Sequence, residues 1–335
     1  MKQKFSFEPR WFAVVIFFIA GLFMGAFVLF IWIFNGGRFY GIQKIHPATG
    51  SYKFINPLIA VEREQITDFF ANESLQTKLA SIIDKHKKNQ DIQEGAVYFR
   101  DLDPGRWVGI NEDLKFSPGK LLKMPIMIAY FKEAETTPAI LQKKLVYHTN
   151  PKSTAVDTQA NLEDGQSYTV EEFINDMITN DTGNAPNILY DNIDKEALNE
   201  IFSDLGINFI EDKQTDDYIT VKQYSLFFRV LYNATYLNRE FSEKALDILS
   251  QTSNIKGIAE GLPNDLTISH KYRTRNFTQN GSQLQESHDC GIVYYPQHPY
   301  LLCTMGIGKT SGAISNTFKD LSQAIYEDMS KSYKN

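Results

Sequence analysis

The chain opens with a long apolar stretch. Residues 11–34, WFAVVIFFIAGLFMGAFVLFIWIF, are 24 positions without a charge. At about 1.5 Å of rise per residue, a helix of this length spans roughly 36 Å, whereas the hydrocarbon core of a bilayer is about 30 Å thick. A cleaved signal peptide has a shorter apolar run and a small-residue cleavage site. The pattern therefore predicts a transmembrane helix over residues 11–34.

The charges before this helix predict its orientation. Lys2, Lys4 and Arg10 precede it against the single acid Glu8. Because basic residues stay on the cytoplasmic side, we expect residues 1–10 in the cytoplasm and everything from about residue 35 outside it, on a single-pass anchor in the cell membrane.

The helix also contains a GxxxG pair, Gly21 and Gly25. Small residues at this spacing let two helix backbones approach closely, which would allow a weak dimer. Glycine is also common in membrane helices that do not pair, so a monomeric anchor is the interpretation we favour and the weak dimer is the alternative.

After the apolar run the pattern changes twice. Residues 35–72 have weak periodicity, a Gly-Gly pair and isolated prolines, and are interpreted as a membrane-proximal stalk. Over residues 73–335, stretches with the hydrophobic periodicity of helices and of strands follow one another, which indicates one folded domain. Their expected elements are a helix over 75–88, a hairpin turning at 103–105, helices to about 249, strands at 266–272, 289–296 and 299–308, and a helix over 314–331.

This order predicts an α+β fold. Two N-terminal strands and three later ones would form one antiparallel five-stranded sheet, with the terminal helices packed on it and an all-helical lobe inserted between them. Aromatic residues at helical spacing, Phe227, Phe228, Tyr232 and Tyr236, are expected in the core of that lobe.

Composition excludes some functions. The net charge is −6 and no basic stripe occurs, which argues against a nucleic-acid partner. The six histidines show no metal-ligand spacing, so neither a metal nor a cofactor is expected. Cys290 and Cys303 lie on neighbouring strands, where a disulfide is conceivable, although two small buried residues is the interpretation we favour.

Several phrases resemble the class A serine β-lactamases and their penicillin-binding relatives. They are FSPGKLLKMP at 116–125, LEDGQSYTVEEFINDMI at 162–178, APNIL at 185–189, SHK at 269–271 and the two strands that follow. The resemblance covers about residues 75–331. It implies a serine β-lactamase-like fold. It also implies a protein of the bacterial cell envelope whose ligand is peptidoglycan-like or β-lactam-like. It also implies a site built from SxxK, SDN and KTG motifs.

The first motif fits in two registers. If the flanking residues set the alignment, Lys123 is the motif lysine and Lys120 occupies the position of the nucleophilic serine, which is lost. If the literal match SPGK sets it, Ser117 is the nucleophile and Lys120 its partner. We favour the first register, because Ser117 followed by Pro118 has the profile of a helix N-cap. Covalent chemistry from Lys120 itself is a more distant alternative.

The other two motifs are also altered. Asp181, Thr182 and Gly183 stand at the SDN positions, and Lys271 is followed by Tyr272 and Arg273 where KTG is expected. The literal near-match at 309–312 lies beyond the last strand and is interpreted as a decoy. We therefore predict a pseudoenzyme that acts as a binding module. The alternative is an active serine hydrolase, such as a β-lactamase, that uses Ser117 and Lys120.

The altered site makes a geometric prediction. The fold implied by the resemblance brings Lys120, Lys123 and Lys271 together at the former nucleophile pocket. Cations that share an enclosed cleft repel one another unless an acid compensates them. Asp181 is expected to do so, within hydrogen-bond reach of at least one of these lysines.

The predicted orientation can be tested by fusing a reporter after Asn335. A reporter that is active only in the cytoplasm should be silent there, because the positive-inside rule sends the C-terminal domain across the membrane. A second fusion before Trp11 serves as the control and should be active. Activity of the C-terminal fusion would show that the assigned topology is wrong.

Overall fold

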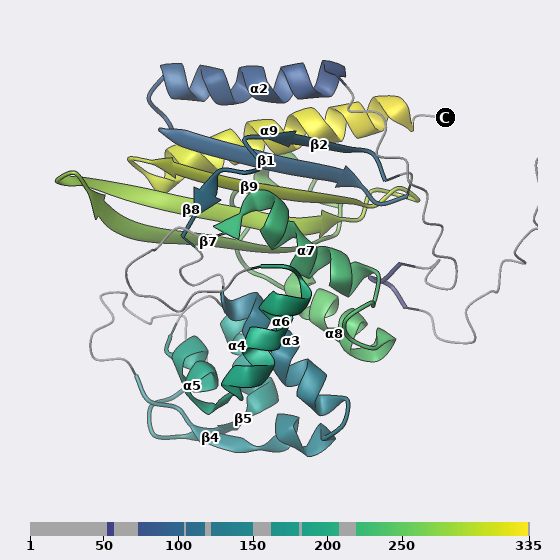
Figure 1. The fold of residues 1–335 in the computed structure, drawn as a ribbon, viewed down its shortest axis with the longest axis vertical. Coiled ribbons are helices and arrows are strands. Elements are labelled where there is room, and N and C mark those ends of the chain that lie inside the picture. The colour runs from purple at the N-terminus through teal and green to yellow at the C-terminus, as the bar shows by residue number, and fades with distance from the viewer. Residues whose placement is uncertain are drawn as a thin grey trace, which may run out of the picture. The chain divides into compact units, whose positions relative to one another are not determined.

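A five-stranded antiparallel sheet forms the centre of the structure, a computed structural model (Figure 1). The structure describes residues 52–56, 73–103, 105–117, 122–149, 162–180, 183–207 and 219–333. The strand order is β2-β1-β9-β8-β7, and every neighbouring pair is antiparallel. The strands are β1 Glu94–Asp101, β2 Trp107–Ile110, β7 Ile268–Gln279, β8 Ser282–Val293 and β9 Tyr300–Gly308.

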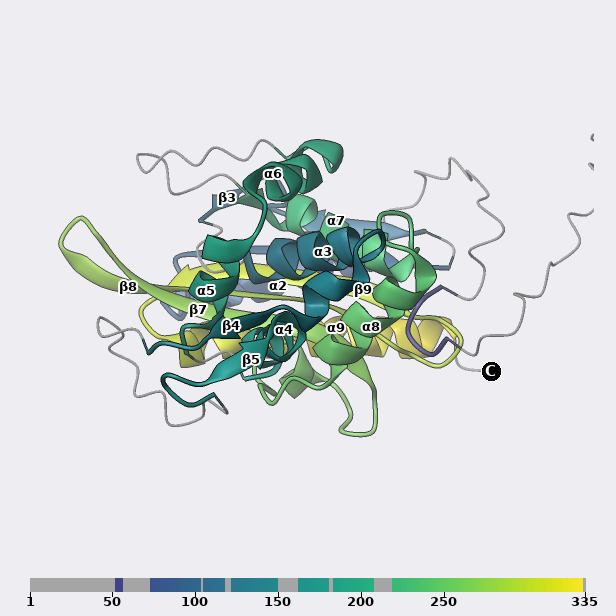
Figure 2. The same cartoon turned by 90° about the horizontal axis from the view of Figure 1, so that it is seen from below.

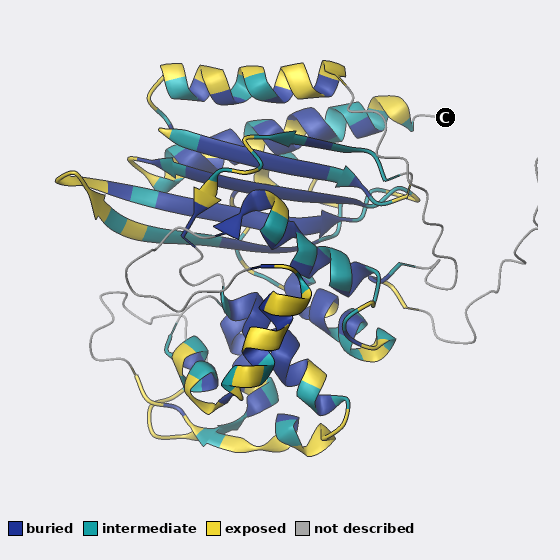
Figure 3. Cartoon of the chain, viewed as in Figure 1, coloured by how far each residue is buried: buried dark blue, intermediate teal, exposed yellow. Residues whose placement is uncertain are grey.

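The two terminal helices cover one face of the sheet. They are α2 Glu73–Lys88 and α9 Ser311–Ser332, and Figure 1 shows them stacked above it. Leu75, Leu79 and Ile83 recur at intervals of four, so one stripe of α2 is buried. Figure 3 shows the opposite stripe exposed. The sequence-based prediction of the sheet and both terminal helices is confirmed.

The other face of the sheet packs on a lobe of helices. They are α3 Lys123–Ala134, α4 Val170–Thr179, α5 Ala185–Asn192, α6 Lys195–Asp204, α7 Val221–Tyr232 and α8 Arg239–Ser250, with short 3₁₀ helices η2 Pro138–Gln142 here and η3 Ala259–Gly261 before β7. Figure 2 shows these helices from below, beneath the sheet. Phe227 and Phe228 are fully buried in this core, as predicted.

Local sequence sets the start of two of these helices. Thr169 accepts a hydrogen bond from the backbone of Glu172, whose carboxylate accepts one from the backbone of Thr169 in return. Thr220 and Gln223 repeat this capping box at the start of α7. Each box satisfies two backbone N–H groups that the helix leaves without partners.

The lobe is not all helical, which corrects the prediction. Two short ribbons accompany the helices: β3 Lys115–Phe116 pairs with β6 Ile219–Thr220, and β4 Lys144–Val146 pairs with β5 Ser167–Thr169. Strands of two or three residues are too short to show a period of two, so the pattern of the sequence could not reveal them.

Cys290 and Cys303 lie directly opposite one another on β8 and β9. The structure joins them by a disulfide whose Cα atoms are 4.0 Å apart, and both residues are buried on the face toward the lobe. The sequence allowed this bond but favoured two unlinked buried cysteines.

Within the described part of the chain, no helix is long and apolar enough to cross a membrane. The predicted transmembrane helix over residues 11–34, with Gly21 and Gly25, lies outside the described residues.

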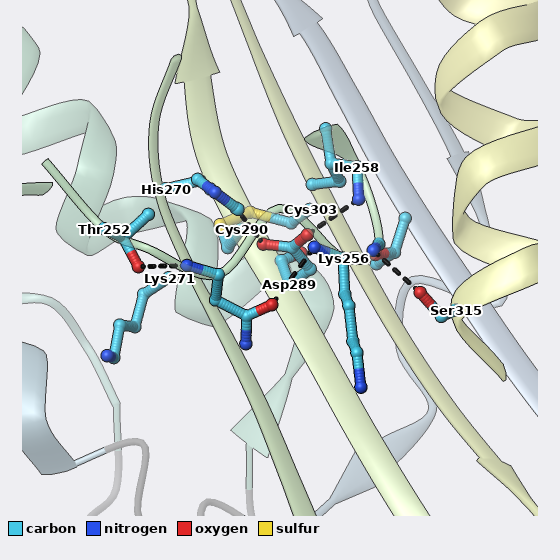
Figure 4. A network of polar contacts seen from close by, with 12 residues as sticks. Thr252, Lys256, Ile258, His270, Lys271, Asp289, Cys290, Cys303 and Ser315 are labelled. Atoms are coloured by element: carbon cyan, nitrogen blue, oxygen red, sulfur yellow. Dashed lines mark hydrogen bonds and ion pairs between the residues drawn. A yellow bond between two sulfur atoms is a disulfide. The ribbon is translucent and has the colours of Figure 1, made fainter. Parts of the chain in front are cut away.

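A buried carboxylate ties the loop before β7 to the sheet. Asp289 on β8 is fully buried, and its two oxygens contact His270 Nδ1 at 2.9 Å and the backbone N–H of Ile258 at 2.7 Å. Ser315 on α9 accepts a hydrogen bond from the neighbouring Gly257 N–H. His270 is therefore a core residue, and Figure 4 shows it pointing toward Asp289 while Lys271 points away from this network.

Asp289→Ala should lower the free energy of unfolding by about 3 kcal/mol. A hydrogen bond to a charged group contributes roughly 1.5–3 kcal/mol, and the substitution leaves a buried imidazole and a buried N–H without their acceptor. Chemical denaturation measures the change. Asp265→Ala, at an exposed position on the same loop, should stay within about 0.5 kcal/mol of the parent. Equal effects of the two substitutions would contradict the assigned role of Asp289.

Candidate functional site

The carbonyl end of α4 brings two of the predicted site lysines together. Lys123, at the start of α3, donates from Nζ to the Met177 carbonyl oxygen at 3.2 Å. Lys271, on β7, donates to the carbonyl oxygen of Ile178, the next residue, at 2.6 Å. Both lysines are only 2% exposed. The two ammonium groups therefore meet at consecutive peptide units, as the resemblance implied for these positions.

A third donor completes this end of α4. Ser253, in the loop after α8, reaches the Thr179 carbonyl oxygen with both its backbone N–H and its hydroxyl. The last carbonyls of a helix have no partners within it and carry the negative end of its dipole. Two cations and a serine thus act as a tertiary cap. Asp176, one residue before Met177, is also buried and accepts a hydrogen bond from the Asn180 amide.

The remaining predicted site residues are only partly described. Lys120 and Asp181 lie outside the described residues, so the expected contact between Asp181 and a lysine is not tested. Ser117 is buried directly after β3. The α-helical part of α3 begins at Lys123, with Leu122 at its N-cap. Residues 118–121 lie outside the described residues, so the N-cap role expected for Ser117 stays a prediction. Among the described residues, no hydrogen bond joins Ser117 to Lys123 or Lys271.

The strand at the KTG position presents different side chains to its two sides. Tyr272 is buried in the core beneath α9, where its hydroxyl contacts Ser287 and Thr274. Arg273 lies opposite His288 in the register of β7 and β8 and is partly exposed. The near-match at 309–312 is a helix start, since Thr310 accepts a hydrogen bond from the Ala313 N–H at the N-cap of α9. This capping role agrees with the interpretation of the near-match as a decoy, which stays a prediction.

A buried ionic cluster that the sequence did not reveal lies next along the same strands. Arg275 contacts Glu286 Oε2 through Nε at 3.1 Å and Nη2 at 2.7 Å, and His288 Nε2 contacts Glu286 Oε1 at 2.6 Å. Phe116, just before Ser117, packs edge-on against the His288 ring. Arg275 and Glu286 come together because β7 pairs with β8, so no local sequence motif predicts the cluster.

This cluster controls the charge of Glu286, which is fully buried. Burial alone would raise the pKa of the Glu286 carboxyl. The hydrogen bond and charge of His288, together with those of Arg275, outweigh burial and hold that pKa below its usual range. Glu286 is therefore an anion at neutral pH, and it compensates the cations on this side of the sheet.

Comparison with known proteins identifies the family. A sequence model described as the beta-lactamase enzyme family matches residues 74–329, which is most of the chain. The chain belongs to this family. Among curated proteins, no sequence matches it.

Solved structures share the fold at low sequence identity. An acyl-enzyme complex of a PBP-A variant with penicillin G is 20% identical, covers 78% of this chain and 97% of its own, and has a TM-score of 0.63. A β-lactamase from Sphaerobacter thermophilus is 17% identical, and the match covers 75% of this chain and 96% of that protein with a TM-score of 0.64. The extended-spectrum β-lactamase TLA-3 is 15% identical, and the match covers 77% of this chain and 99% of that protein with a TM-score of 0.67. The domain is thus an α+β, β-lactamase-like fold.

Glu286→Gln should destabilise the domain at neutral pH, by about 3–5 kcal/mol, because it removes the buried partner of Arg275 and His288. Because the pKa of Glu286 is lower in the folded protein than in the unfolded chain, where it is near 4.3, the carboxylate stabilises the fold fully above the unfolded pKa. This stabilisation is lost as the pH falls through the pKa of Glu286 in the folded protein. The difference in unfolding free energy between parent and variant should therefore shrink below about pH 4. Denaturant melts from pH 7 to pH 3 measure it.

The matched control for this prediction is Glu200→Gln on the exposed side of α6. Its unfolding free energy should follow the parent curve at every pH. A gap between Glu286→Gln and the parent that stays constant down to pH 3 would contradict the assigned charge state of Glu286.

Proposed function

We propose that this chain is a membrane-anchored, extracytoplasmic member of the beta-lactamase family that lacks acylation chemistry and serves as a binding module of the cell envelope. The observation that carries the proposal is the use of Lys123 and Lys271 as donors to the end of α4. Both stand where the resemblance places the lysines of the catalytic site, and here both have a structural task.

The nucleophile side of the site supports the same conclusion. In the register set by the flanking residues, lysine replaces the serine at position 120, and removing such a serine costs a serine hydrolase on the order of a millionfold in turnover. Ser117, the alternative nucleophile, is 4% exposed and follows a short strand. A nucleophile must reach its substrate, and this burial does not favour Ser117 in that role.

The charges of β7 support an anionic ligand. Successive residues of a strand point to opposite faces, so Lys271 and Arg273 share the face toward the lobe. Arg275, on that face too, is compensated by Glu286. Lys271 is held against α4, so Arg273, which is partly exposed, is the cation on this face that would attract the carboxylate of a peptidoglycan-like or β-lactam-like molecule. Binding without acylation is the activity that we infer.

Incubating the full chain in detergent with a fluorescent penicillin tests the chemistry. No covalent adduct should survive denaturation, because the acylating serine is absent from the favoured register. A stable adduct that mass spectrometry maps to Ser117, and that Ser117→Ala abolishes, would establish the alternative, an active serine hydrolase.

Fluorescence anisotropy with the same probe tests reversible binding. Arg273→Ala should weaken it about tenfold to a hundredfold, since a charge-assisted hydrogen bond contributes roughly 1.5–3 kcal/mol. Lys309→Ala, in the decoy motif, is the matched control and should leave the affinity unchanged. Saturable binding that Arg273→Ala does not alter would remove β7 from the ligand site.

A further inference from the structure

A short segment far upstream of the family's domain is built into the helical lobe. Residues 52–56, called the strap here, precede the start of α2 by the sixteen residues 57–72 and lie within the predicted stalk. The family match begins only at residue 74. Figures 1 and 2 show the strap, in purple, beside α7 and α8.

A single carboxylate holds the backbone of the strap. Glu243, on α8, accepts hydrogen bonds from three consecutive N–H groups. These are Lys53 at 2.5 Å and Phe54 at 3.0 Å to Oε1, and Phe54 and Ile55 at 2.9 Å each to Oε2. Hydrogen bonds to an ionised acceptor are about twice as strong as neutral ones. Three successive backbone donors on one carboxylate fix both the position and the direction of the strap.

The strap also completes the C-terminal end of α7. The Asn56 N–H donates to the Tyr232 carbonyl oxygen at 2.7 Å, and the Asn56 side-chain amide donates to Asn233 Oδ1 at 3.1 Å. Tyr232 is the last residue of α7, and no backbone N–H of the helix itself can donate to its carbonyl oxygen. The strap therefore supplies a donor that the lobe needs.

Two apolar side chains anchor the strap in the core. Phe54 and Ile55 are 3% and 4% exposed and belong to the same buried cluster as the helices of the lobe. The Phe54 ring lies edge-on to Tyr294, 5.3 Å between centroids. Burying side chains of this size contributes about 1.5–3 kcal/mol each, so the contact is not a loose one.

We infer that the surface formed by α7, α8 and Tyr294 is a docking site for the chain's own N-terminal segment, and that it makes the lobe, rather than α2, the point where the N-terminal part of the chain is fastened to the domain. The conclusion about the membrane rests on the proposed anchor at residues 11–34. With the strap docked, the tether comprises residues 35–51 and reaches at most about 60 Å. Without it, residues 35–72 would reach about 130 Å. The strap would thus shorten the maximum length of the tether by about half.

Hydrogen exchange on the full chain in detergent tests the docking without any membrane. The amides of Lys53, Phe54 and Ile55 should exchange slowly in the parent. Glu243→Gln should speed their exchange about tenfold to a hundredfold, because one oxygen is replaced by a donor group that repels an N–H. Exchange in β1 should stay unchanged and shows that the domain remains folded. Glu240→Gln, on the first turn of α8, is the matched control and should behave as the parent.

Two results would overturn the docking: rapid exchange of these amides in the parent, or unchanged protection in Glu243→Gln. If Glu243→Gln fails to fold, Phe54→Ala removes the apolar anchor without altering α8 and must release the same amides.

A second arm measures the tether. A dye on Glu200→Cys of the full chain in vesicles should transfer energy to acceptor lipids, and Glu243→Gln should reduce that transfer. A chain that does not enter vesicles refutes the anchor and leaves the exchange result standing. Unchanged transfer in a variant whose strap amides are released refutes the tether role.

Discussion

The last carbonyls of α4 are the constraint on which the arrangement of the two halves depends. A helix cannot satisfy its own C-terminal carbonyls, and here the donors come from three other elements: Lys123 of α3, Lys271 of β7 and Ser253 of the loop after α8. The sheet and the lobe therefore meet at one helix end. Because both lysines are buried, their charges need this acceptor, and the acceptor needs them. The residues of the candidate site, Lys123 and Lys271, are therefore also the residues that join the sheet to the helical lobe.

Much of the fold could be predicted because its signals are local. The stripe of α2, the turn between β1 and β2, and the apolar runs of β8 and β9 each appear within a dozen residues. What escaped prediction depends on partners far away in the chain. The ribbons β3–β6 and β4–β5 are too short for periodicity. The strap carries no pattern of its own, since Glu243, its acceptor, lies 190 residues beyond Lys53.

The candidate site divides in the same way. The meeting of Lys123 and Lys271 was expected only because a family resemblance supplied the fold, since nothing near either residue indicates the other. The role of Ser253 and the cluster of Arg275, Glu286 and His288 could not be foreseen, because each follows from strand register or from the path of a loop. Conversely, the literal motif at 309–312 was set aside by its position after the last strand, where Thr310 has an ordinary capping role.

The position of β7 at the border of the sheet has a consequence for how copies of this protein behave at high concentration. A border strand exposes backbone groups that can pair with another sheet. Lys271, Arg273 and Arg275 occupy alternate positions along this border. Lys271 is buried against α4 and Arg275 is paired with Glu286, so the partly exposed Arg273 is the charge that two such borders would bring against each other. The cation that would attract an anionic ligand thus also opposes pairing of the sheet with another copy, so a neutral substitution of Arg273 should be judged for solubility as well as for affinity.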